Sequence, residues 1–287
     1  MPQWSVLWPH SSTSIAVSAD WVLAVVATPR ATSIGAVAAG LCERSVVRPV
    51  VGSVVGTFSR GCYVRCDGDL VAVGQIPTGP LHVVVDQAAM QHEGDRVDFS
   101  RGLLRIGRSE LDLSRADEWS PQPPSVQTVD ALRRALHQRR SEAEVEPDLA
   151  VVWNEVCAGA RRGDGLRVVR LLGGRGTGLT PAGDDVIAGL LLSASWSDRG
   201  AADEPSRVAV ADSVRSSDLS RSFLHWAARG HSIGPVHALL CAASGDRPER
   251  FGRAIAQVAS IGASSGRSLL VGLTLGLDHG VSFRDRV

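Results

Sequence analysis

The segment "GGRGTGLTPAGDD", residues 173–185, places glycines, a threonine and two aspartates directly before an apolar run. Glycine-rich turns that lead into a helix expose backbone N–H groups that can bind an anion. The residues expected to donate through backbone or hydroxyl groups are Gly176, Gly178, Leu179 and Thr180. Asp184 or Asp185 would accept an N–H group from the ligand. We therefore expect a small ligand that is anionic at one end and carries N–H at the other, or else a tight turn with nothing bound.

The same loop nearly matches the phosphate-binding loop of nucleotide triphosphatases, but Leu179 stands where that motif requires Lys. All 30 basic residues are Arg, so Schiff-base chemistry on Lys is excluded as well. Positive charge at the site would come from Arg175 or Arg267. The sequence thus disfavours a triphosphatase and favours a smaller anion.

Asp184 and Asp185 are candidate catalytic residues, although carboxylates in a first helical turn can also serve only the helix dipole. Neighbouring helical residues diverge by about 100°, so we expect the pair not to share a metal ion. The histidines and cysteines show no metal-ligand spacing that indicates zinc. We expect no metal and no cofactor.

Two further motifs could carry chemistry. "GASSG", residues 262–266, resembles the nucleophile elbow of serine hydrolases, but the preceding "FGRAIAQVASI" predicts a helix where an elbow needs a strand. A hydrolase is therefore disfavoured. His231, within "RGHSIG", is the third candidate catalytic residue; the alternative is an ordinary loop histidine.

A weak internal repeat relates "GDDVIAGL", residues 183–190, to "GRSLLVGL", residues 266–273. Two loop-to-helix starts of one design could face each other. The candidate substrate-binding residues that this adds are Gly183, Ser264, Ser265 and Gly266. The alternative is that Gly189 and Gly272 only let two helices pack closely.

Two kinds of element must position these residues. Valine-rich runs from about 45 to 113 predict short strands, with hairpin turns at Asp67-Gly68 and in "GRSE", residues 107–110. Three prolines within residues 116–128 indicate a domain boundary. Beyond it, the periodicity predicts helices at about 129–143, 148–161, 165–172, 181–196, 218–229, 234–243, 249–260 and 266–277. Residues 197–212 are expected to form a mobile loop.

The predicted fold class is α+β, with a β-rich domain over residues 1–120 and an all-helical domain over 121–287. The chain has 287 residues, 44% of them hydrophobic, and a formal net charge of zero, so no overall field favours nucleic acid. Five scattered cysteines argue against a secreted disulfide framework. With no basic n-region or apolar run of about 20 residues, we expect a cytoplasmic protein without membrane contact.

"GRGTGLTPAGDDVIAGLL" resembles the glycine-loop signature of a family that includes the AllH-type subunit of oxamate carbamoyltransferase. "SSDLSRSFLHWAARGHSIGPVHALL" and "IGASSGRSLLVGLTLGL" resemble two later blocks of that family in the same order. The resemblance covers about residues 154–277. Ala182, Ala263 and Arg267 depart from the family pattern.

The resemblance implies a carbamoyltransferase-type subunit that acts on oxamate, oxalurate or carbamoyl phosphate. Partners would be the small anionic substrate and other carbamoyltransferase subunits, or further copies in a homo-oligomer. Two alternatives stay open: a non-catalytic assembly subunit of such a complex, and a stand-alone enzyme in another, biosynthetic pathway.

Overall fold

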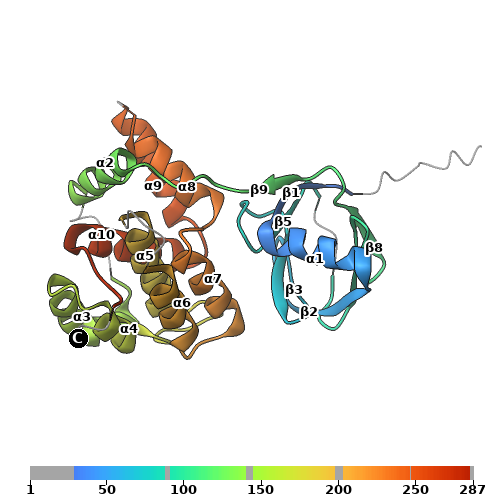
Figure 1. Ribbon diagram of the computed structural model, residues 1–287, viewed down its shortest axis with the longest axis horizontal. Helices are drawn as coiled ribbons and strands as arrows, with labels where there is room; N and C mark the ends of the chain where they lie inside the picture. The colour runs from blue at the N-terminus through green and yellow to red at the C-terminus, as the bar shows by residue number, and fades with distance from the viewer. Residues whose placement is uncertain (1–28, 88–90, 140–144, 198–202, 246, 285–287) are drawn as a thin grey trace, which may run out of the picture.

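The computed structural model describes residues 29–87, 91–139, 145–197, 203–245 and 247–284. Strands occupy the N-terminal half and helices most of the C-terminal half, which confirms the α+β class. Figure 1 shows the two parts side by side. We call residues 29–119 the sheet region and residues 126–284 the helical region.

The sheet region is a single curled sheet of nine strands. The strands are β1 (Ala31–Gly35), β2 (Val50–Phe58), β3 (Gly61–Cys66), β4 (Asp69–Gly74), β5 (His82–Val85), β6 (Arg96–Ser100), β7 (Leu103–Ile106), β8 (Ser109–Asp112) and β9 (Asp117–Trp119). They are hydrogen-bonded in the order β8-β7-β6-β2-β3-β4-β5-β1-β9. An isolated bridge from Arg30 to Asp112 shows that the sheet curls until β8 approaches the chain before β1.

Both predicted hairpin turns are present. Asp67 and Gly68 adopt φ values of 52° and 86° between β3 and β4, as a two-residue turn with positive φ requires. Gly107, at φ 57°, begins the turn between β7 and β8. The inner face of the sheet packs on helix α1 (Ala36–Val47), whose Leu41 is fully buried. The sequence patterns had given no sign of this helix.

A helix is present at each of the eight predicted positions, although the first ends at His137 instead of residue 143, and residues 140–144 lie outside the described residues. These helices are α2 (Val126–His137), α3 (Ala150–Arg161), α4 (Gly165–Leu172), α5 (Ala182–Ser197), α7 (Asp218–Ala228), α8 (Gly234–Ala243), α9 (Pro248–Ala259) and α10 (Ser265–His279), and a 3-10 turn, η2 (Pro147–Leu149), precedes α3. They surround one hydrophobic core that includes most of α5.

The expectation of a loop over residues 197–212 is wrong for most of that range, because Glu204–Ser213 forms helix α6. Pro205 lies in its first turn, where a missing N–H group costs no hydrogen bond. Arg207 is 4% exposed and donates from Nε to the carbonyl of Ala228 at 2.9 Å. The polar residues of this segment therefore belong to a helix, and one of them, Arg207, is buried. Residues 198–202 lie outside the described residues.

Helices α5 and α10 pack in close contact, as the repeat suggested. A Cβ added to Gly272 would lie 2.0 Å from the carbonyl oxygen of Val186, and one added to Gly189 would lie 2.3 Å from that of Leu269. Gly276 likewise faces Ser193 one turn further along both helices. Because the contacts between α5 and α10 advance in the same direction along both helices, the helices run parallel and start at the same end.

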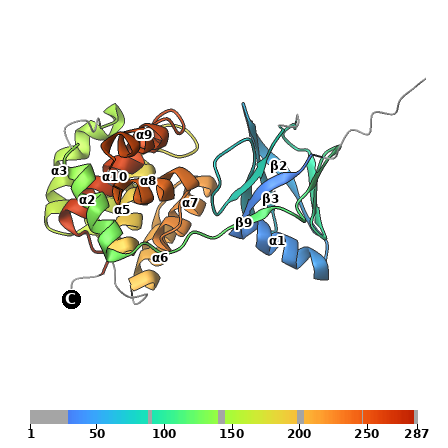
Figure 2. The same ribbon diagram turned by 90° about the horizontal axis from the view of Figure 1, so that it is seen from above.

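The two regions meet along α7 and the start of α8 (Figure 2). The amide of Gly234 donates to the carbonyl of Thr78 at 2.7 Å, and the ring of His82 lies 6.0 Å from that of Phe223. Burial lowers the pKa of His82 to about 4. The extended segment 120–125 links β9 to α2. Division into domains at residues 120 and 121 stays a prediction.

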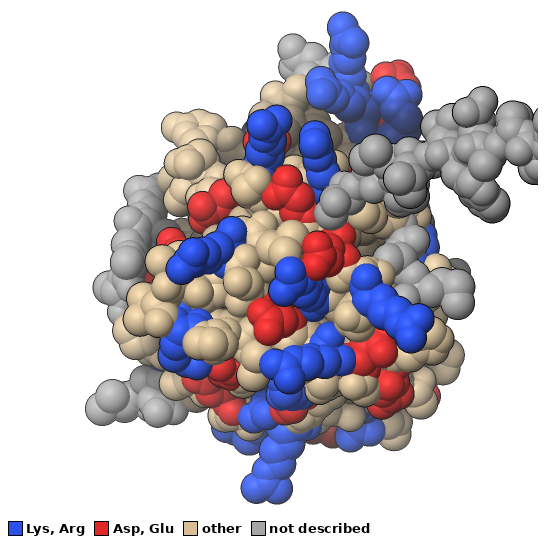
Figure 3. Space-filling model, turned by 90° about the vertical axis from the view of Figure 1, so that its right-hand side faces the viewer, with Lys and Arg blue, Asp and Glu red and all other residues tan. Residues whose placement is uncertain are grey.

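Charge is mixed on the outer face of the sheet region. Figure 3 shows arginine and acidic side chains interspersed there. Arg105 of β7, for example, pairs with Glu110 of β8 at 2.6 Å. No helix within the described parts of the chain is both long enough and apolar enough to cross a membrane.

Candidate functional site

Asp184 connects the glycine loop, residues 173–180, to the start of α7. Its side chain is 1% exposed and accepts from the amide of Gly174 at 2.7 Å and from the hydroxyl of Ser220 at 2.6 Å. The hydroxyl of Ser216 donates to it as well. With three donors in the protein, Asp184 holds these segments together.

The glycine loop presents backbone amides. Gly174, Gly176 and Gly178 adopt φ values of 70°, 115° and 93°, which alternate with negative values at their neighbours. Such alternation turns successive N–H groups toward one side and forms an anion-binding concavity. The loop amides from Gly176 to Leu179 have no hydrogen-bond acceptor within the described residues.

The start of α10 lies against the start of α5. Thr180 and Ser265 join the two helices through their hydroxyl oxygens, 2.9 Å apart. Ser268, one turn further along α10, is 2% exposed, and its hydroxyl finds no partner in the described part of the chain. Two helix N-termini thus lie side by side, and both dipoles favour negative charge there. We call the glycine loop with these two helix starts the helix-start site.

Asp185 is the acidic residue that lies at the helix-start site. Burial raises its pKa to about 8, although hydrogen bonds with the hydroxyls of Ser265 and Thr180 partly oppose this. Its Oδ2 atom is buried and has no partner among the described residues. At neutral pH the group is therefore largely a neutral carboxyl, which can donate as well as accept a hydrogen bond. The two adjacent aspartates have different surroundings.

The other predicted binding residues differ in their positions. Arg175 lies in the loop, with its Nε donating to the carbonyl of Leu171 at 3.2 Å. Gly183 and Gly266 are buried, and each has its N–H bonded within the protein and backbone where a Cβ would be. Ser264 caps α10. Arg267 is two residues beyond Ser265 on the helix and pairs with Glu146 at 2.9 Å, so it turns away from the site.

His231 is not brought to the helix-start site. It lies beside Gly230, Ser195 and Trp196, at the opposite end of α5 from Asp185. Trp196 follows Asp185 by eleven positions in α5, a distance of about 16 Å along the helix axis. Burial lowers the pKa of His231. A shared catalytic step with Asp185 has no support in this geometry.

Sequence patterns missed the serines that support the site. Ser216 and Ser220 bind Asp184, while the hydroxyl of Ser217 caps α7 and donates to the carbonyl of Leu179. The run "SSDLS", with a capping serine before a helix, was the available signal. The hydrogen bond from Ser217 to Leu179 places the start of α7, a third helix start, next to the glycine loop.

Together these groups suit one kind of ligand. Loop amides, two hydroxyls and two helix N-termini favour an anion, and a neutral carboxyl can exchange hydrogen bonds with an amide. A carboxyl with a pKa near the operating pH is also suited to proton transfer.

Residues 172–277 match the family model described as oxamate carbamoyltransferase subunit AllH. The matched range begins at the last residue of α4 and ends within α10, so it includes the whole helix-start site. No solved structure matches the chain. The predicted resemblance to the AllH-type family is thus confirmed over residues 172–277.

Proposed function

We propose that this chain is a subunit of a carbamoyltransferase and binds a small anionic amide, of the oxamate or carbamoyl phosphate class, at the helix-start site. One observation carries the proposal. Two helix starts, joined by the Thr180–Ser265 hydrogen bond, lie beside a buried carboxyl that has an unpartnered oxygen. The family description of residues 172–277 supports the same class of reaction.

The charged end of the ligand would bind the amides of the glycine loop. Gly178 is the most open glycine of residues 174, 176 and 178, because a Cβ there would meet nothing within 4 Å, and its amide has no acceptor among the described residues. Open space over a bare backbone is what a carboxylate or phosphate needs. The guanidinium of Arg175 adds positive charge to the same loop.

Asp185 would move the proton. When phosphate attacks the carbamoyl group of oxalurate, an O–C bond forms at the carbamoyl carbon and the C–N bond to the oxamate nitrogen breaks. That nitrogen needs a proton, which the neutral carboxyl of Asp185 can supply. In the reverse direction, the carboxylate takes the proton back as oxamate attacks carbamoyl phosphate.

The word "subunit" in the family description supports a chain that acts as part of a complex. Its partners would be other carbamoyltransferase subunits or further copies of this chain. A non-catalytic assembly subunit would use the same loop without binding a ligand. A stand-alone enzyme would turn over without partners. Ligand binding by the purified chain separates the first alternative from the proposal, and turnover by the purified chain separates the second.

A thermal-shift experiment tests the anion site. The purified full chain is heated with oxamate, carbamoyl phosphate or inorganic phosphate, and the Gly178→Val variant is compared with Gly94→Val. Gly94 is a matched control because it has a similar φ, 88°, and nothing within 4 Å of an added Cβ. Both variants introduce the same backbone strain, but only the first obstructs the proposed site.

We expect the wild-type chain and Gly94→Val to gain stability with oxamate or carbamoyl phosphate, and Gly178→Val to gain none. If Gly178→Val responds as the control does, the loop does not bind the anion. If no chain responds, the assembly alternative is favoured over the proposed binding role.

A further inference from the structure

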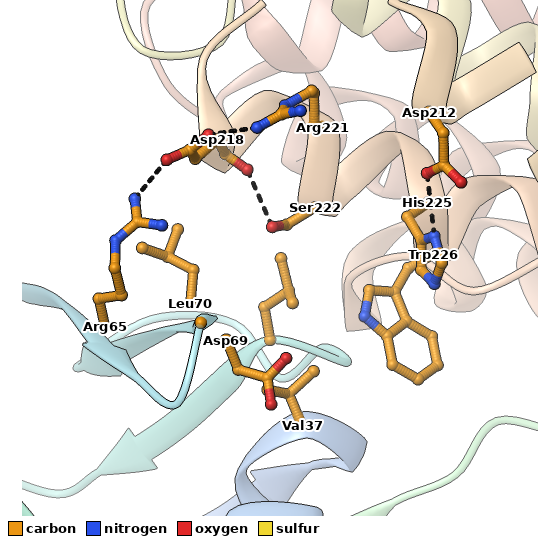
Figure 4. Close-up of a pocket in the computed structure, with 12 residues that line it drawn as sticks. Val37, Arg65, Asp69, Leu70, Asp212, Asp218, Arg221, Ser222, His225 and Trp226 are labelled. Atoms are coloured by element: carbon orange, nitrogen blue, oxygen red, sulfur yellow. Dashed lines mark hydrogen bonds and ion pairs between the residues drawn. The ribbon is translucent and has the colours of Figure 1, made fainter. Parts of the chain in front are cut away.

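A cavity with a volume of about 380 Å³ lies between the sheet region and α7. Arg65 of β3 lines it from one side, and Asp218, Arg221, Ser222 and Trp226 of α7 line it from the other (Figure 4). We call this cavity the cleft. Cavities of a few hundred Å³ are the usual size for small-molecule ligands.

Asp218 lies between two guanidinium groups of the cleft. Arg65 donates to its Oδ2 at 2.6 Å, and Arg221 donates to its Oδ1 at 2.5 Å. Neither arginine forms another ion pair within the described residues. Since each guanidinium has five N–H donors, most donors of both groups remain for a ligand. One carboxylate thus holds two cations in place, and the three side chains keep a net positive charge.

Asp69, Asp212 and His225 also line the cleft. Asp69 pairs with Arg44, and Asp212 lies 3.4 Å from His225. The cleft offers apolar surface as well. Leu70 and Leu81 are 5% and 2% exposed and form a packed base. The half-buried indole of Trp226 stands on the helix side, at the far end of the cleft from Asp218 in Figure 4. An indole face suits a flat, apolar group, and arginine pairs suit a carboxylate or phosphate.

We propose that the cleft binds a small organic anion, with its charged group at Arg65 and Arg221 and its flat, apolar part against Trp226. This site is separate from the helix-start site. The two share only the first turn of α7, where Ser217 donates to Leu179 of the glycine loop and Asp218 faces the cleft. The proposal does not depend on carbamoyl transfer.

Calorimetric titration with 2-naphthoate tests the proposal, because this probe joins a carboxylate to a flat apolar body. The uncharged 2-naphthamide is the matched ligand. The variants are Arg65→Gln, Arg221→Gln and Trp226→Leu. Arg105→Gln is the control, because Arg105 forms an ion pair of the same 2.6 Å length with Glu110, away from the cleft.

We expect 2-naphthoate to bind the wild-type chain and Arg105→Gln equally, and to bind each of Arg65→Gln and Arg221→Gln roughly tenfold more weakly. Trp226→Leu should weaken both ligands, and 2-naphthamide should bind wild type more weakly than 2-naphthoate does. Gly178→Val should bind 2-naphthoate normally, which separates this site from the anion loop. Absence of binding by wild type, or equal affinity in the two cleft arginine variants and the control, would overturn the proposal.

Discussion

The helix-start site and the cleft lie on the two sides of the first turn of α7, yet they are built from different material. The first uses backbone amides, hydroxyls and one buried carboxyl within the helical core. The second uses long arginine side chains, 39% and 50% exposed, from residues that are far apart in the chain.

The difference teaches where each site obtains its precision. At the helix-start site, close packing of α5 on α10 fixes the positions of the donors, so the addition of one methyl group should destabilise the site. In the cleft, solvent-exposed ion pairs fix the cations, and such pairs contribute little to stability. The first site should be sensitive to packing changes, and the second should tolerate substitution without unfolding.

The largest effect is expected from Gly272→Ala. The added Cβ would lie 2.0 Å from the carbonyl of Val186, so the parallel helices must separate. We expect the free energy of unfolding to fall by about 3–5 kcal/mol in chemical denaturation. Gly40→Ala, in α1, is the control, because its Cβ would meet only a side-chain atom at 3.6 Å. Equal stability of the two variants would mean that packing does not fix this site.

Asp184→Ala should have the next largest effect. It leaves the amide of Gly174 and the hydroxyls of Ser216 and Ser220 without their acceptor in a buried place, which costs about 2–4 kcal/mol of unfolding free energy. Asp218→Ala, which removes the acceptor of the exposed cleft arginines, should change stability far less. Denaturation curves of both variants compare the two sites directly, and equal losses would contradict the contrast.

The pH dependence of stability should identify Asp185. Its folded pKa, about 8, lies above the ordinary carboxyl value of about 3.9, so the native state holds more protons between these values. Stability attributable to this group is full below about pH 4 and is lost as pH rises toward 8. We expect Asp185→Asn to remove a fall of roughly 3 kcal/mol between pH 5 and pH 8. An unchanged slope in the variant would show that Asp185 ionises normally.

Arg65→Gln is expected to have the smallest effect on stability. Arg65 pairs with Asp218 on the surface of the cleft, and exposed pairs are screened by solvent. Its melting temperature should match that of Arg105→Gln, while its affinity for 2-naphthoate falls. A large loss of stability would instead show that this pair holds the sheet region on the helical region.

Local signals in the sequence predicted much of the fold. Turn glycines located the hairpins, and the glycine loop with its repeat suggested the facing helix starts. Helix α1, residues 36–47, was missed because its packing depends on the sheet. Helix α6 was missed because Arg207 is buried through a hydrogen bond to the carbonyl of Ala228, which is distant in the sequence. These are tertiary effects without a local pattern.

The orientation of the two aspartates could not be predicted. Helix α5 is buried on nearly every side, from Ala182 to Trp196, so no apolar stripe shows which face meets the core. Asp184 and Asp185 therefore looked equivalent. The cleft was equally hidden, because Arg65 and Asp218 are 153 residues apart and Arg65 belongs to no motif. His231 was chosen from its sequence motif "RGHSIG", but it lies near Trp196, at the opposite end of α5 from Asp185.

The most direct test of the central claim is the affinity of the full chain for oxamate, measured by calorimetry from pH 6 to pH 10. If the bound anion lies beside Asp185, the ionised carboxylate repels it and the neutral carboxyl binds it better, so the affinity of wild type should fall as pH rises above about 8. Asp185→Asn should bind oxamate with an affinity that does not change across this range. Failure of wild type to bind, or the same pH profile in both chains, would contradict the account.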